Sequence, residues 1–60
     1  MKFYPVFVLN DGRVLRLNPQ ASEQDALRVI DGAFDMDRFF FQGKTFQMVL
    51  VDRCFIHTVK

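Results

Sequence analysis

The sequence predicts an α+β domain in which one helix packs on a mostly antiparallel five-stranded sheet. Three observations indicate this fold. Residues 2–17 read as two strands around a turn, residues 22–34 carry apolar side chains at helical spacing, and the last third consists of strand-like runs joined by tight turns. The expected order is strand, strand, helix, strand, strand, strand, in a single small domain that spans residues 1–60.

The first hairpin is rich in β-branched and aromatic residues on both sides of Asn10-Asp11-Gly12, a sequence that tolerates positive φ. A two-residue turn and a three-residue loop both fit, and they place different side chains on the same face. The two groups are Val6, Val8, Leu15 and Leu17 for the shorter turn, and Phe7, Leu9 and Leu15 for the longer loop. Pro5 lacks an amide hydrogen and therefore indicates an edge or a bulge at that point.

A helix is expected to begin after Ser22, because this residue suits an N-cap and Asp25 adds an acidic first turn. One stripe of the helix is apolar and should face the sheet. It consists of Ala26, Leu27, Ile30, Ala33 and Phe34. Gly32 is a candidate C-cap or a weak point in the last turn. Residues 35–37 should form a short connection to the next strand.

The last third contains strand-like runs near residues 38–42, 45–51 and 54–59, separated by Gly43-Lys44 and Asp52-Arg53. Both connections suit tight turns, and they predict a simple meander of neighbouring strands. One face of this meander should lie under the helix. It carries Phe39, Phe41, Phe46, Met48, Leu50, Phe55, His57 and Val59.

The opposite face of the meander has an apolar centre, and one helix cannot cover both faces of a five-stranded sheet. We therefore expect this second face to meet a protein partner or another copy of the chain, as a homodimer or a higher oligomer. The chain would then act as a small non-enzymatic interaction module of the adaptor or inhibitor type. The residues expected to bind the partner are Phe40, Gln47, Val49, Val51, Cys54, Ile56 and Thr58.

Composition favours a folded domain over a disordered one, since half of the residues are hydrophobic and eight are phenylalanine. The net charge of +1 provides no global field that would attract nucleic acid or anionic lipid. No run approaches about 18 apolar residues, and the first residues do not resemble a signal peptide, so we expect a cytoplasmic protein with no membrane partner. Cys54 is the only cysteine, which leaves oligomerisation as the usual way to stabilise so small a core.

No catalytic, cofactor-binding or metal-binding constellation emerges. Cys54 and His57 have a spacing found in metal sites, but an odd separation along a strand points them to opposite faces. The aspartates of residues 31–37 lack the alternating ligands of a calcium loop. The only serine, Ser22, is already used as a helix cap, which leaves no nucleophile beside a base. The sequence therefore predicts that the protein is not an enzyme.

Binding of single-stranded nucleic acid is the alternative. Arg38, Phe40 and Lys44 interleave basic and aromatic side chains, and an aromatic ring on a sheet can stack on a base. The neighbouring phenylalanines are needed for the core, so only Phe40 is free to stack. Steep salt dependence would distinguish a nucleic-acid partner from an apolar protein interface.

The first 46 residues resemble the ubiquitin-like beta-grasp group. Residues 7–17, 22–30 and 39–46 carry the resemblance, as a hairpin, a capped helix and a strand that enters a Gly-Lys turn. It implies a non-enzymatic domain that binds partners through its sheet surface. The chain ends His57-Thr58-Val59-Lys60 instead of Gly-Gly, so conjugation and sulfur carriage are not implied.

Two further expectations concern topology and source. In the beta-grasp group a long connection lets the last strand lie beside the first, and a two-residue Asp52-Arg53 turn is too short for such a crossover. The small size of the chain suggests an adaptor or inhibitor encoded by a phage or a plasmid.

Overall fold

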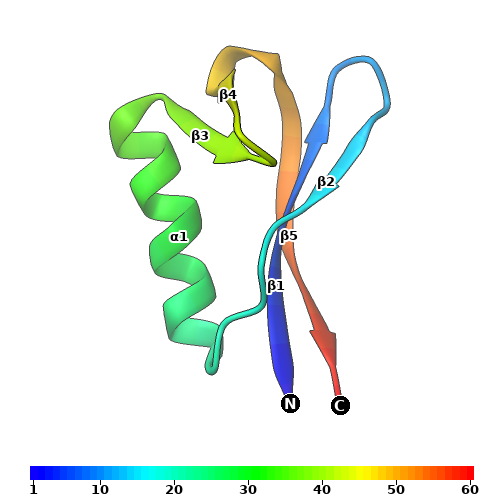
Figure 1. Ribbon diagram of the computed structural model, residues 1–60, viewed down its shortest axis with the longest axis vertical. Coiled ribbons are helices and arrows are strands. Elements are labelled where there is room, and N and C mark those ends of the chain that lie inside the picture. The colour runs from blue at the N-terminus through cyan, green and yellow to red at the C-terminus, as the bar shows by residue number, and fades with distance from the viewer.

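The computed structural model describes all 60 residues, and it confirms the predicted α+β class and the order of the elements. Strands β1 (Lys2–Leu9) and β2 (Val14–Arg16) precede helix α1 (Glu23–Met36). Strands β3 (Arg38–Phe41), β4 (Lys44–Gln47) and β5 (Val51–Val59) follow, with a 3-10 turn at Met48–Leu50 before β5. The predicted single sheet is divided into a three-stranded sheet of order β2-β1-β5 and a two-stranded β3-β4 hairpin (Figure 1).

The helix and the β3-β4 hairpin cover the same face of the three-stranded sheet, which we call the inner face (Figure 1). Phe7 of β1 stacks on Phe39 of β3 with 4.1 Å between ring centroids. Phe39 in turn stacks on Phe46 of β4 at 5.5 Å. Because this column of rings joins the two sheets face to face, the hairpin acts as part of the cover instead of widening the sheet.

The first hairpin adopts the longer of the two predicted loops. Phe7 pairs with Leu15, and the Leu9 N–H donates to the Arg13 carbonyl at 2.8 Å. Gly12 closes the loop with φ +93° and donates its N–H to the Leu9 carbonyl at 2.9 Å. A left-handed third residue is typical of three-residue hairpin loops. Phe7, Leu9 and Leu15 therefore share the inner face.

Pro5 lies in the central strand at the point where its neighbour β2 ends. The Leu17 N–H donates to the Pro5 carbonyl at 2.9 Å, but proline has no N–H to return the bond. The ladder between β1 and β2 stops after Arg16 for this reason. Pro5 thus interrupts the hydrogen bonds between β1 and β2, as expected for a proline at an edge or a bulge.

The predicted start of the helix is confirmed. Ser22 is the N-cap, and its hydroxyl accepts a hydrogen bond from the Asp25 N–H at 3.1 Å. This bond satisfies one of the amide groups that the first helical turn leaves without a partner. Arg28 adds an exposed ion pair with Asp25 at 3.2 Å.

The helix ends later than predicted. It continues through Gly32 to Met36, and Asp37 forms the C-cap in the left-handed conformation with φ 60°. The Asp37 N–H donates to carbonyl groups of the last turn. Aspartate is among the few residues that adopt this conformation readily, so the chain does not need Gly32 as a cap. Residues 35–36 belong to the last helical turn and not to a connection.

The buried stripe of the helix is narrower than predicted. Ala26, Ile30 and Ala33 are buried, whereas the side chains of Leu27 and Phe34 are 44% and 58% exposed. Leu27 and Phe34 each follow a buried alanine by one residue, which rotates them about 100° around the helix axis. The helix covers the inner face together with the β3-β4 hairpin, so the side of the helix that carries Leu27 and Phe34 has no part of the sheet to pack against.

The last third departs most from the prediction. The β3-β4 turn lies at Gln42-Gly43, where both residues have positive φ, as a two-residue type I′ turn requires. The chain then reverses at Met48–Leu50, whereas Asp52-Arg53 lies inside β5. Asn10 anchors this reversal, because its N–H donates to the Leu50 carbonyl at 2.8 Å. Strand β5 consequently pairs antiparallel with β1, and the predicted meander is wrong.

Gln42→Asn is expected to stabilise the fold by up to about 1 kcal/mol. Gln42 has φ 50°, and asparagine before glycine is the preferred residue at this position of a type I′ turn. The midpoint of urea unfolding should rise at an unchanged slope. Gln47→Asn is the matched control, because Gln47 has an extended backbone with φ −84° and should gain nothing. Equal midpoints for both variants would contradict a strained turn at Gln42.

Candidate functional site

The face of the three-stranded sheet that points away from the helix carries no other element of the chain (Figure 1). Cross-strand partners share a face, so the register defines this surface, which we call the outer face. Its side chains are Lys2, Tyr4, Val6 and Val8 from β1, Val14 and Arg16 from β2, and Arg53, Phe55, His57 and Val59 from β5.

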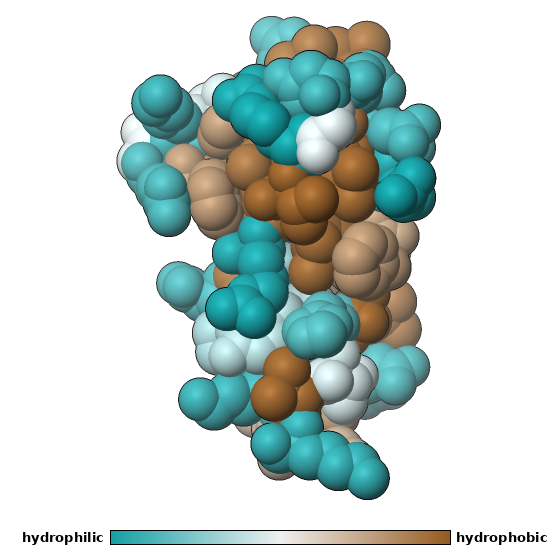
Figure 2. Space-filling model, turned by 90° about the vertical axis from the view of Figure 1, so that its right-hand side faces the viewer, coloured by the Kyte–Doolittle hydropathy of each residue, from teal (hydrophilic) through white to brown (hydrophobic).

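The centre of the outer face is apolar. Val6 and Val8 are buried, while Val14 and Phe55 remain 61% and 44% exposed. Figure 2 views the molecule from the side away from the helix and shows apolar residues gathered over its upper half, with polar groups around them. An exposed apolar area with a polar rim is the usual appearance of an interaction site.

The charged side chains of the outer face are all basic. The Arg16 guanidinium lies over the Tyr4 ring, 4.2 Å from its centroid, in a cation–π contact. Arg53 forms an exposed ion pair with Asp52 at 3.3 Å, and Lys2 lies at the far end of the sheet. The outer face thus combines an apolar centre with a border of basic side chains, of which Arg53 is paired with the Asp52 carboxylate.

The structure places Cys54, Ile56 and Val51, all predicted to bind a partner, beside the core. Cys54 pairs with Phe7 and Ile56 with Pro5, so both share the inner face, and Val51 also packs against the core. The prediction that these residues share a face with Phe40 is therefore wrong. The prediction paired β5 with β4, whereas β5 pairs with β1. In this register the side of β5 that carries Cys54 and Ile56 faces the core, because successive residues of a strand point to opposite faces.

The other predicted partner-binding residues are exposed but scattered. Phe40 and Gln47 lie on the side of the β3-β4 hairpin that points away from the ring stack, with Phe40 63% exposed. Val49 lies in the 3-10 turn, and Thr58 lies near the end of β5 opposite Phe3. The structure therefore does not bring the predicted set together on one surface.

The three residues of the nucleic-acid alternative are also divided. Arg38 and Phe40 lie two residues apart on one strand and share a face. Lys44 pairs with Phe41 and so belongs to the opposite face of the hairpin. The hairpin offers one exposed ring and one cation on that side, not the interleaved platform that the sequence suggested.

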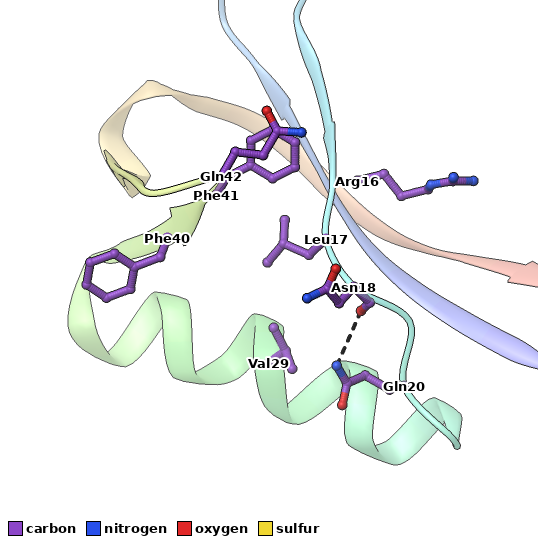
Figure 3. A pocket seen from close by; sticks show the side chains of 8 residues that line it. All are labelled: Arg16, Leu17, Asn18, Gln20, Val29, Phe40, Phe41 and Gln42. Atoms are coloured by element: carbon purple, nitrogen blue, oxygen red, sulfur yellow. Dashed lines mark hydrogen bonds between the residues drawn. The ribbon is translucent and has the colours of Figure 1, made fainter.

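A pocket of about 400 Å³ lies beside the helix, between the segment after β2 and the end of β3 (Figure 3). It is lined by Arg16, Leu17, Asn18, Gln20, Val29, Phe40, Phe41 and Gln42. Figure 3 shows the Arg16 side chain directed away from the pocket, and Gln20 donates to the Asn18 carbonyl at 3.3 Å. The pocket therefore presents apolar walls and amide groups, and none of its groups is suited to proton transfer.

Cys54 and His57 point to opposite faces of β5, as their spacing predicted. Partial burial raises the pKa of the Cys54 thiol, which disfavours the reactive thiolate at neutral pH. The structure contains no cluster of three or more histidine, cysteine, aspartate or glutamate side chains able to hold a metal ion. Helix α1 has neither the length nor the apolar character needed to cross a membrane.

Comparison of the chain with protein-family models, curated proteins and solved structures gave no match. The resemblance to the beta-grasp group therefore stays a prediction. The outer face itself was missed at the sequence level, although a signal for it exists. Val6-Phe7-Val8-Leu9 is an unbroken apolar run, which is typical of a central strand that needs cover on both faces.

Proposed function

We propose that this chain is a small non-enzymatic protein-interaction module, of the adaptor or inhibitor type, that docks a protein partner on its outer face. The observation that carries the proposal is the exposure of Val14 and Phe55 above the buried pair Val6 and Val8. No element of the chain packs on them, and a partner would remove this apolar surface from water.

The charges on the outer face define the partner further. Arg16, Lys2 and Arg53 border the apolar centre, and only Arg53 has a carboxylate partner, Asp52. A complementary partner presents an apolar patch surrounded by acidic side chains. Two outer faces would oppose like charges, so the partner on this surface is a different protein and not a second copy of the chain.

A protein partner fits the outer face better than a nucleic acid does. Val6, Val8 and Val14 are aliphatic and provide no ring on which a base can stack. The Tyr4 ring is covered by the Arg16 guanidinium, so Phe55 is the one free aromatic ring at the centre of the face. Basic side chains at the border then serve to orient an acidic protein.

Val14→Glu is expected to leave the chain folded and to weaken partner binding at least about tenfold. The carboxylate is solvated in the free protein because Val14 is exposed, but it would be buried without a partner charge in the complex. The parent chain serves as bait in extracts of its native host. A protein that the parent retains is then titrated against the purified variants by calorimetry.

Val49→Glu is the matched control, since Val49 is 71% exposed and lies in the 3-10 turn, outside the outer face. It should bind the partner as the parent does. Equal affinities for Val14→Glu and the parent would exclude the outer face as the docking surface. Binding of a labelled single-stranded oligonucleotide that weakens steeply with salt and is lost in Phe55→Ala would favour a nucleic-acid partner instead.

A further inference from the structure

Strand β5 has one edge without a neighbour. It is the last strand of the order β2-β1-β5. The bonds from Leu9 to Arg13 and from Leu17 to Pro5 show that odd-numbered residues of β1 bond β2, so its even-numbered residues bond β5. Their partners on β5 are Arg53, Phe55, His57 and Val59.

The residues between these partners direct their backbone groups outward. The N–H and C=O groups of Cys54, Ile56 and Thr58 therefore point away from β1, and no hydrogen bond outside the strand ladders reaches them. The free edge follows nearly the whole of β5, a strand of 9 residues.

This edge lacks the features that usually prevent edge pairing. Edge strands are commonly short, or they carry charges, prolines or bulges along their length. The other edge strand of the sheet, β2, has 3 residues and runs into Asn18-Pro19. In β5 the bulge lies at its start opposite Val8, and residues 54–59 contain neither a proline nor an aspartate, glutamate, lysine or arginine.

We propose that a second copy of this chain pairs antiparallel with the free edge of β5, about a two-fold axis at Ile56. The product is a continuous six-stranded sheet in which the two β5 strands are neighbours. In this register Ile56 faces Ile56 of the second copy, and Cys54 faces Thr58 of the second copy. This register gives a hydrogen-bond partner to every outward N–H and C=O group of Cys54, Ile56 and Thr58. A two-fold axis at Phe55 or Cys54 would leave some of these groups without a partner.

The charges of β5 are self-complementary in the same register. Asp52 lies at the start of the strand and Lys60 follows its end, so antiparallel pairing brings each Asp52 opposite Lys60 of the second copy. On the outer face Phe55 meets His57, and Arg53 meets Val59, which opposes no like charges. The pairing uses the strand edge and leaves Val14 free, so it does not depend on the proposed function.

The decisive experiment introduces one cysteine. Thr58→Cys places a thiol opposite Cys54 of the second copy, in a hydrogen-bonded pair with Cα atoms about 5.5 Å apart, which is within the range for a disulfide. Oxidised glutathione at alkaline pH should convert most of the variant into a covalent dimer, measured by non-reducing electrophoresis and intact mass. Thr58 is exposed, so this change should not disturb the fold.

Three controls test the register. The parent should not crosslink, because Cys54 and Cys54 of the second copy lie four residues apart along the strands, about 13 Å. His57→Cys should not crosslink to Cys54, since position 57 faces the other side of the sheet. The double variant Cys54→Ala, Thr58→Cys should also stay uncrosslinked, because its two cysteines at position 58 again lie four residues apart along the strands.

Sedimentation equilibrium of the parent should show a reversible dimer. Lys60→Glu should weaken it by about 2-fold to 30-fold, since it removes two exposed ion pairs. Asp52→Lys combined with Lys60→Glu should recover affinity. A parent that stays monomeric together with an uncrosslinked Thr58→Cys variant would overturn the proposal, and so would equal crosslinking of His57→Cys and Thr58→Cys.

Discussion

Replacing Phe7 by alanine is expected to leave this chain largely unfolded at room temperature. Phe7 is fully buried and stacks on Phe39 across the interface between the two sheets. Truncation of a buried phenylalanine costs about 3 to 5 kcal/mol. A core of this size provides about 3 to 5 kcal/mol in total. The loss therefore equals the whole free energy of unfolding, and circular dichroism should show no cooperative melting transition for the variant.

Phe40→Ala is the matched control for Phe7→Ala. It removes the same ring from a position that is 63% exposed and outside the ring stack. Its melting temperature should stay close to that of the parent. A Phe7→Ala variant that melts cooperatively within a few degrees of the parent would show that the ring stack does not hold the two sheets together.

Local signals in the sequence predicted the elements well. Asn10-Asp11-Gly12 indicated the hairpin, and Ser22 with Asp25 indicated the helix start, because turns and caps depend on residues that are close in the chain. The ring-bearing face of the β3-β4 hairpin was also assigned correctly, since Phe39, Phe41 and Phe46 share it in the structure.

The residues predicted to bind a partner do not lie on one surface, and the reason is non-local. Asp52-Arg53 has the composition of a tight turn, but it lies inside β5, where Asp52 coincides with the bulge opposite Val8. The choice between a meander and pairing with β1 depends on the free energy of the whole assembly. The apolar run of β1 requires a neighbour on each edge and cover on the inner face, and β5 is the strand that satisfies the second edge. Short-range sequence patterns do not report which of these two strand pairings has the lower free energy.

The division of the sheet also explains why the apolar side chains of residues 38–60 do not form one surface patch. The β3-β4 hairpin uses its phenylalanines as a cover, and β5 contributes Cys54 and Ile56 to the same core. The outer face of the three-stranded sheet remains without cover. Because one helix covers only one face of the sheet, we propose that Val14 and Phe55 of the outer face, and not Phe40 and Val49, meet the partner.

Ile30→Ala is expected to lower the free energy of unfolding by about 2 to 5 kcal/mol, whereas Leu27→Ala should lower it by about 1 kcal/mol or less. Both changes shorten an aliphatic side chain to alanine in the same helix, so they alter helix propensity in a similar way. They differ in burial, because Ile30 belongs to the core cluster and Leu27 is 44% exposed.

The two variants measure which flank of the helix faces the sheet. The stripe read from the sequence weights Leu27 and Ile30 equally, whereas the structure turns the helix so that Ala26, Ile30 and Ala33 form the contact. Urea unfolding at matched slopes gives both free energies directly. Similar losses for Leu27→Ala and Ile30→Ala would mean that the helix is rotated toward its Leu27 flank. If only Ile30→Ala lowers the free energy of unfolding, the stripe of Ala26, Ile30 and Ala33 packs on the sheet near Phe7 and Phe39. Leu27 then lies in water.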